Sequence, residues 1–386
     1  MKEKIEKFKN SIRNTIENIK LKLSIIKYKI TLRLSQITPI KLFSFMGIDF
    51  TASYSWFIGI AVISYLIYKN LFLVLYPKYP PIILTASSII SALMLYLSIA
   101  LHELAHSIVA RKYQVEVREI RMFLLGGIAI LDRELSTPKA EFKTAVAGPL
   151  LSIALGLLFL IIGNAIPEKS PLTGIIIYTA FANLVIAVFN LTPAFPLDGG
   201  RMLRSLLWRK YDLVKATKIV ANLGKAFGIF LILVSAYYIA KGYYIKPIIG
   251  SLLGVYITIM SRVALQNTLI SHALSIIKVK EIMVPTKQLG QEPSIIISPT
   301  KNTNKEVFKI IGMMLAEKIN VENFFVKEND TLLDAFIKFN KFPMIENLIV
   351  IDEKNNKVGI ILREVLEKVK EIKLKEIKLK EKLKIS

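Results

Sequence analysis

The order of apolar and polar positions divides the chain into a polar N-terminal segment, a long apolar middle and a mixed C-terminal part. Each apolar stretch of the middle part approaches or exceeds the roughly 20 residues that a helix needs to cross a bilayer. These stretches lie near 52–76, 82–110, 140–164, 172–192, 218–240 and 245–263. The pattern therefore predicts a polytopic α-helical membrane protein, with about six transmembrane helices in one domain of residues 50–265.

The first 45 residues are rich in lysine, with apolar residues such as Ile5, Phe8, Ile12 and Ile16 recurring at helical spacing. This pattern is typical of a basic amphipathic helix that lies on an anionic membrane surface. A solvated charged tail that holds the N-terminus in the cytoplasm is the alternative. We treat residues 1–49 as a separate N-terminal segment and assign no chemistry to it.

The segment between the second and third apolar stretches has a different pattern. Apolar residues from Val115 to Met122 nearly alternate with charged ones, and Phe123 to Ile130 follow, with Gly126 and Gly127 among them. Near-alternation with β-branched residues predicts short strands, which form a small membrane-associated structure. An open strand edge beside a catalytic site could bind an extended substrate by strand addition. An amphipathic hairpin that turns at the two glycines is the alternative.

Hydropathy falls after residue 265, and residues 275–370 alternate short apolar strands with helical stretches. One unit runs from residue 321 through a helix after Asp330 and a Val/Ile strand to the strand at 357–363; the unit before it, from residue 279, is short and degenerate. This order resembles a CBS domain, so we expect a cytoplasmic α/β regulatory domain over 275–370. The resemblance implies either binding of an adenosine nucleotide or a homodimer without ligand. Residues 371–386 form a charged helical tail, and His272 falls in the linker.

Composition supports the membrane assignment. Of the 386 residues, 53% are hydrophobic, and the formal net charge is +23. Lysine and arginine concentrate at the two ends and in loops 111–139 and 199–215, and we find no nucleic-acid-binding motif. By the positive-inside rule, we expect a multi-pass cell-membrane protein with both termini cytoplasmic. Because the chain has no cysteine, a zinc site would use His, Asp or Glu.

Two of the three histidines lie in one pentapeptide, His102-Glu103-Leu104-Ala105-His106, near the end of the second apolar stretch. On a helix, both imidazoles would share one face and could reach one metal ion, with Glu103 beside them. This is the spacing of a zinc hydrolase, whose glutamate takes a proton from the attacking water. Two ordinary histidines on a polar face are the alternative. Ionisable residues in apolar spans are costly, however, and are functional by default.

The fourth apolar stretch ends in a second motif, which runs from Asn190 to Arg201 and contains Pro193, Pro196 and Asp198-Gly199-Gly200. A zinc hydrolase needs a third protein ligand and an open position, and Asp198 is the best candidate. Its alternative role is that of a turn or N-cap residue. Asn190 could donate a hydrogen bond to a developing oxyanion or to the substrate carbonyl. An interhelical hydrogen bond is the alternative for Asn190.

These motifs, with the Gly148-Pro149 pair of the third stretch, resemble the site-2 protease family of intramembrane zinc metalloproteases over roughly residues 50–265. The resemblance implies that His102, His106 and Asp198 bind one zinc ion per chain and that Glu103 is the general base. It also implies that Asn190 lies near the site and that the loop at 117–130 receives an unwound transmembrane helix of the substrate.

Two other classes of protein remain as alternatives. A membrane transporter or channel gated by CBS domains would show repeated halves or matched discontinuous spans, and we find no internal repeat. A catalytically silent membrane scaffold would not need the intact set of His102, Glu103, His106 and Asp198. The sequence therefore favours a zinc-dependent endopeptidase that cleaves a membrane-protein substrate within the bilayer, in regulated intramembrane proteolysis.

Overall fold

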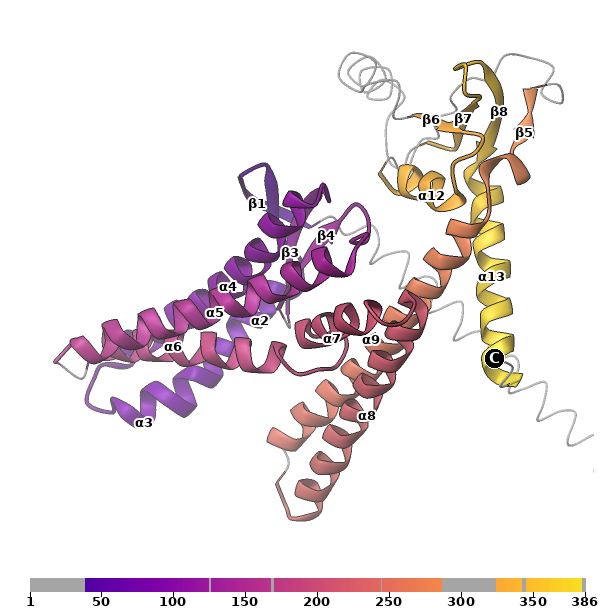
Figure 1. The fold of residues 1–386 in the computed structure, drawn as a ribbon. Coiled ribbons are helices and arrows are strands. Elements are labelled where there is room, and N and C mark those ends of the chain that lie inside the picture. The colour runs from indigo at the N-terminus through magenta and orange to yellow at the C-terminus, as the bar shows by residue number, and fades with distance from the viewer. Residues whose placement is uncertain are drawn as a thin grey trace, which may run out of the picture.

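The computed structural model describes residues 39–124, 126–167, 170–243, 245–286, 324–341 and 345–383. Within them the chain is mostly helical, and six helices are long and apolar enough to cross a membrane (Figure 1). The first span comprises α2 (Tyr54–Ile67), the π-helix η1 (Tyr68–Phe72) and α3 (Leu73–Leu75). The other five are α4 (Pro81–Lys112), α5 (Pro138–Ala165), α6 (Pro171–Asn190), α8 (Leu213–Ala240) and α9 (Ile245–Ile276). The six predicted spans are thus confirmed.

Capping residues fix where several of these helices begin. Thr137 precedes Pro138, and its hydroxyl accepts a hydrogen bond from the Ala140 amide at 3.2 Å. Asp212 caps α8 in the same way, accepting from the Lys215 amide at 2.8 Å. Side-chain oxygens at these positions satisfy amides that have no partner within the helix, and proline suits the first helical position. The residues at which α5 and α8 begin are therefore determined by neighbouring residues in the sequence.

A four-stranded sheet lies beside the first two spans. Its order is β1 (Ile40–Phe45), β2 (Ile48–Ala52), β3 (Val117–Phe123) and β4 (Gly126–Leu131), with β2 parallel to β3 and the other pairs antiparallel. The strands predicted near 117–130 are confirmed, although the two glycines belong to β4 rather than to the turn.

The strands β1 and β2 correct the expectation for the N-terminal segment. Residues 40–45 are a strand and not the end of an amphipathic helix, and the boundary at residue 49 falls inside β2. The reason is tertiary: Ile48 and Phe50 of β2 are buried in one cluster with Ile120 of β3 and Leu104 of α4. The part of the predicted N-terminal helix up to residue 38 lies outside the described residues.

The spans form two groups in the described part of the chain. Helices α4, α5 and α6 pack on one another, and α2 packs on α4. Helices α8 and α9 form a hairpin that packs chiefly on itself and on the short helix α7 (Asp198–Trp208), which also contacts α5 (Figure 1). The short helix α7 therefore joins the two groups.

The C-terminal unit has a second four-stranded sheet, ordered β5 (Val284–Pro285), β8 (Lys357–Leu362), β7 (Asn347–Ile351) and β6 (Phe325–Lys327). The 3₁₀ helix η2 (Val279–Glu281) precedes β5, α12 (Leu332–Lys341) follows β6, and α13 (Arg363–Leu383) follows β8. The predicted order after Asp330 is found. Most of the predicted degenerate unit, residues 287–323, lies outside the described residues.

The boundary between the two parts differs from the expected linker. Helix α9 continues to Ile276, and its residues Ile270 and Leu274 are buried in the core of the C-terminal unit. His272 therefore lies on a helix and not in a linker. The charged segment after residue 371 likewise continues α13 without a break. Apolar burial in the core of the C-terminal unit extends α9, and packing of α13 on α9 accompanies the extension of α13, beyond the limits that hydropathy indicated.

Candidate metal centre

Three side chains converge where α4 meets the beginning of α7. The Nε2 atoms of His102 and His106 lie 3.1 Å apart. Oδ2 of Asp198 lies 3.0 Å from Nε2 of His102 and 3.1 Å from that of His106. All three residues are buried. The helical spacing of the two histidines produces the first part of this arrangement, and the packing of α7 supplies the rest.

The far nitrogen of each imidazole has its own partner on α5. Nδ1 of His106 lies 2.6 Å from the carbonyl oxygen of Thr144, and Nδ1 of His102 lies 2.9 Å from the hydroxyl of Ser152. A carbonyl can only accept, so His106 must donate from Nδ1, which leaves the lone pair of its Nε2 free for a cation. Outer partners of this kind fix the tautomer and the ring orientation of metal-binding histidines.

Gly148 leaves room for a metal between the imidazoles. A Cβ atom at this position would lie 2.3 Å from Nε2 of His106 and 2.6 Å from Nε2 of His102. Any side chain there would occupy the space at which both nitrogen lone pairs point. The absence of a side chain at this position of α5 thus leaves a space about the size of one ion, which we call the cradle, next to the three ligand atoms.

Two further glycines bring Asp198 to this point. A Cβ at Gly199 would lie 2.2 Å from the carbonyl oxygen of Leu191, and one at Gly200 would lie 2.6 Å from the carbonyl carbon of Ala194. Both contacts are with backbone, which cannot move aside as a side chain can. The loop at 191–197 can therefore fold back on the first turn of α7 only because these positions have no side chain.

The donor set fits zinc. Ligand atoms about 2.0–2.1 Å from a tetrahedral ion are about 3.3 Å apart, close to the observed separations. Two imidazoles and one carboxylate are ligands that zinc accepts, and three protein ligands leave a fourth position open. With the proton of each imidazole on Nδ1, two nitrogen lone pairs and a carboxylate oxygen face one another in a buried space, an arrangement that a bound cation would compensate. In the described part of the chain, these residues are the one group of three or more His, Asp or Glu with this geometry.

Glu103 lies beside the cluster, facing the first sheet. Its Oε2 accepts a hydrogen bond from the backbone amide of Ala129 in β4 at 3.2 Å. Its Cγ would lie 3.3 Å from a Cβ placed on Gly127. The carboxylate is thus held between the metal-binding helix and the outer edge of β4, where the predicted general base should meet an extended chain.

Asn190 is placed differently from the expectation. It ends α6, and its amide donates to the carbonyl of Ile186 at 3.0 Å. The described residues show no hydrogen bond between this amide and His102, His106 or Asp198. Its predicted role at the site therefore stays a prediction.

Sequence reasoning did not identify several residues that support the site. Thr144 and Ser152 orient the imidazoles, and the buried carboxylate of Glu141 binds Arg204 of α7 with Nε to Oε1 at 2.7 Å. A lone acidic residue at the start of an apolar span is a visible signal. Its partner lies 63 positions away and could not be chosen from the sequence alone.

Comparisons with known proteins agree with this geometry. The family model described as peptidase family M50 matches residues 90–177 and 164–233. A zinc metalloprotease of Methanocaldococcus jannaschii is 39% identical over 142 residues, which are 36% of this chain and 41% of that protein. A Synechocystis protein whose name places it among the zinc metalloproteases is 38% identical over 192 residues, 49% of this chain and 50% of its own length. The chain therefore spans between two fifths and half of these two curated relatives.

A solved structure also matches. The site-2 protease from Methanocaldococcus jannaschii is 30% identical to this chain, and the alignment covers 58% of this chain and 94% of that one, with a TM-score of 0.44. The match to the family model includes both α4 and α7, which carry the three converging side chains. With the family-model match over both motif-bearing helices and 38–39% identity to the two curated zinc metalloproteases, the chain belongs to peptidase family M50, and its six helices able to span a bilayer make it a multi-pass membrane protein.

Proposed function

We propose that this protein is a zinc-dependent intramembrane endopeptidase that cleaves a transmembrane helix of a membrane-protein substrate. The observation that carries the proposal is the convergence of His102, His106 and Asp198 at 3.0–3.1 Å in a buried cradle, with Glu103 beside it. The three residues would hold one zinc ion per chain. The two histidines lie on α4 and their Nδ1 partners lie on α5, which supports chemistry inside the helical domain.

The roles follow from position. Zinc, when bound, supplies a Lewis acid that polarises a carbonyl and activates water. Glu103 accepts the proton of the attacking water and returns it to the leaving amine, which requires a carboxylate within hydrogen-bonding distance of both. Asn190 is proposed to donate to the substrate carbonyl after its bond to Ile186 is released. Ser152 and Thr144 keep both imidazoles in the required orientation.

The outer edge of β4, the last strand in the order of the first sheet, is the proposed binding site for the substrate chain. Because the Ala129 amide bonds to Glu103, it points away from β3. Backbone groups on one strand alternate between its two sides, so Gly127 also presents its amide and carbonyl to this edge. A helix hides its carbonyls in internal hydrogen bonds, whereas a strand added to β4 would present them beside Glu103. Substrates that unwind at low cost, with Gly or Pro in the span, are expected to be cleaved fastest.

The test compares Glu103→Gln with Glu134→Gln, which removes an exposed acid on the loop after β4. The full-length proteins are purified, their zinc is measured, and each is reconstituted with a single-span substrate that contains Gly and Pro. We expect Glu103→Gln to keep zinc and to lose cleavage, while Glu134→Gln keeps both. Undiminished cleavage by Glu103→Gln would remove this residue from the mechanism.

The orientation and the C-terminal unit are further parts of the proposal. We infer that both termini are cytoplasmic, from the basic loops 111–139 and 199–215. Single cysteines placed at residues 134 and 242 of this cysteine-free chain should be labelled from opposite sides of the membrane, and labelling from one side would refute the topology.

The C-terminal unit is proposed to be a CBS-like regulatory domain that binds an adenosine nucleotide or mediates a homodimer. The strand order β5–β8–β7–β6 with α12 beside it supports a regulatory α/β unit. Calorimetry of the full chain with ATP and AMP tests the first role, and no heat at millimolar nucleotide would refute it. Light scattering of the purified protein tests the second, and a strictly monomeric mass would refute it.

A further inference from the structure

A buried ion pair links α5 to α7. Glu141 is 1% exposed and lies in the first turn of α5. Its Oε1 accepts from Nε of Arg204 at 2.7 Å and also from Nη2 of the same guanidinium. A forked contact of this type fixes both the distance and the orientation of the two side chains. The proposed chemistry does not use either residue, so the pair needs another explanation.

The two partners are each connected to a metal-binding side chain. One turn after Glu141, the carbonyl of Thr144 binds Nδ1 of His106 at 2.6 Å. Six residues before Arg204, Asp198 begins the same short helix and directs Oδ2 toward both imidazoles. A short segment of α5 therefore positions His106 directly and holds, through Arg204, the helix that carries Asp198.

The guanidinium of Arg204 also contacts the second helical group. Its Nη1 lies 3.5 Å from the hydroxyl of Thr268 on α9, and its carbon lies 5.3 Å from the centre of the Phe195 ring. Phe195 and Thr268 are both buried. Arg204 thus stands at the junction of α5, α7, α9 and the loop before α7. Helix α7 packs on α5 on one side and on α8 on the other, so Arg204 lies among the contacts that hold Asp198 near the histidines.

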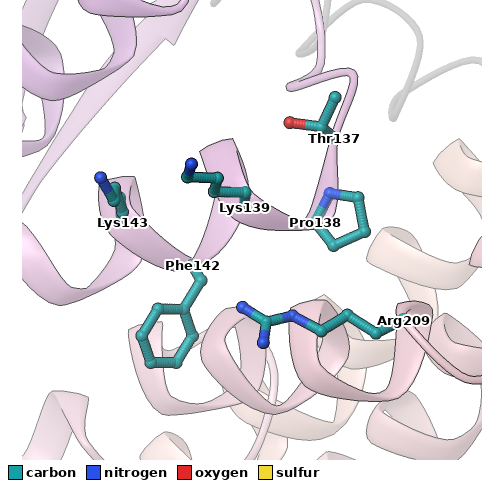
Figure 2. A pocket seen from close by; sticks show the side chains of 6 residues that line it. All are labelled: Thr137, Pro138, Lys139, Phe142, Lys143 and Arg209. Carbon is teal, nitrogen blue, oxygen red and sulfur yellow. The ribbon is translucent and has the colours of Figure 1, made fainter.

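A second contact between α5 and the end of α7 lies at the surface. Figure 2 shows Phe142 of α5 beside Arg209, which follows the last residue of α7; both line an open cleft of about 490 Å³. The Arg209 guanidinium lies 6.0 Å from the centre of the Phe142 ring. This contact joins the same two elements near the buried pair, but it lies at the surface. It provides a matched comparison, since its loss removes a cation between α5 and α7 without leaving a buried charge.

We propose that Glu141 and Arg204 are positioning residues, and that their ion pair sets the distance of Asp198 from His102 and His106. The inference rests on the proposed metal site. It predicts that breaking the pair changes the geometry and the affinity of the metal site in a folded protein. A pair that served stability alone would lower the amount of folded protein but would leave each bound ion in its normal environment.

The experiment uses the full chain in detergent and four variants: Glu141→Gln, Arg204→Met, the double variant, and Arg209→Met as the control. Zinc affinity is measured by competition with a chelator, and the protein loaded with cobalt is examined by visible absorption, which reports ligand geometry. We expect about 10–100-fold weaker zinc binding and an altered spectrum per bound cobalt ion in the first three variants. Arg209→Met should behave like the wild type.

The double variant keeps the test decisive. A single substitution leaves a buried charge without its partner and can prevent folding, whereas removal of both partners is often tolerated. Wild-type zinc affinity and cobalt spectrum in the folded double variant would overturn the proposal, and so would an equal loss in Arg209→Met. Absence of metal from the wild type would instead overturn the metal site itself, so the two failures are distinguishable.

Discussion

Substitution of Gly148 by alanine gives the sharpest test of the metal cradle. The added methyl carbon would lie 2.3 Å from Nε2 of His106, 2.5 Å from its Cε1 and 2.6 Å from Nε2 of His102. Unbonded heavy atoms rest about 3.5 Å apart, so the imidazoles and the methyl group must separate by about 1 Å. Both rings are held from behind by Thr144 and Ser152, which limits their retreat.

The expected effect is a loss of metal rather than a loss of fold. Metal–ligand distances in a good site stay within about 0.2 Å of their ideal values, so a displacement of about 1 Å is several times too large. Removal of outer partners alone costs about 10–100-fold in affinity. A displaced ligand should cost at least the upper end of that range, which corresponds to about 2.8 kcal/mol.

The control is Gly156→Ala, which lies two turns further along α5. Its methyl carbon would lie 2.8 Å from side-chain atoms of Leu184 and far from the metal-binding residues. Overpacking of this kind costs about 1–3 kcal/mol of stability, and the helix gains up to about 1 kcal/mol from alanine. Zinc per folded chain, measured by elemental analysis and chelator competition, should fall in Gly148→Ala only. Wild-type zinc affinity in Gly148→Ala would show that the three side chains do not bind a metal at this point.

Three other predictions concern the same contacts and the C-terminal unit. Ser152→Ala should lower zinc affinity about 10–100-fold by chelator competition, whereas Ser91→Ala, which loses only a bond to its own helix, should not; equal affinities would show that other contacts hold His102. Asp198→Ala should abolish stoichiometric zinc in elemental analysis, and unchanged metal content would make this aspartate merely structural. The hydrogen bond from Lys341 lowers the pKa of Glu116 below its ordinary 4.5. The pair therefore stabilises the folded protein at pH values above 4.5, and this stabilisation is lost as the pH falls through the lowered pKa. The Glu116 side chain is 63% exposed, so Lys341→Met should lower the free energy of unfolding by at most about 1 kcal/mol at pH 7 and should not change it at acidic pH. Thermal unfolding at both pH values measures this difference. A loss of stability that persists in acid would refute the assignment.

The sequence predicts those features that depend on residues near one another in the chain. The six spans follow from length and hydropathy, and the shared face of His102 and His106 follows from the helical repeat alone. Strand β3 is visible in the near-alternation of apolar and charged residues, and β4 lies in the apolar stretch with β-branched residues that follows. Asp198 could be chosen because a chain without cysteine offers few other ligands beside an apolar span.

The remaining features depend on contacts between distant segments. The parallel pairing of β2 with β3 joins residues about 70 positions apart, for which the sequence carries no local signal. The same holds for the pair of Glu141 and Arg204, whose members are visible as polar residues but not as partners. The expected linker near His272 failed for a related reason. The burial of Leu274 by the second sheet, rather than local hydropathy, decides where α9 ends.

Helix α9 belongs to two cores at once. Ile257 and Ser261 are buried where it packs on the rest of the membrane domain, and Ile270 and Leu274 are buried in the C-terminal unit. A protease or a cloning boundary that separates the two units near residue 270 would divide a continuous helix and expose apolar side chains on both products. The C-terminal unit should therefore unfold together with the last turns of α9. Loss of its fold would shorten this membrane-spanning helix from its C-terminal end, which is the end that contacts Arg204 through Thr268.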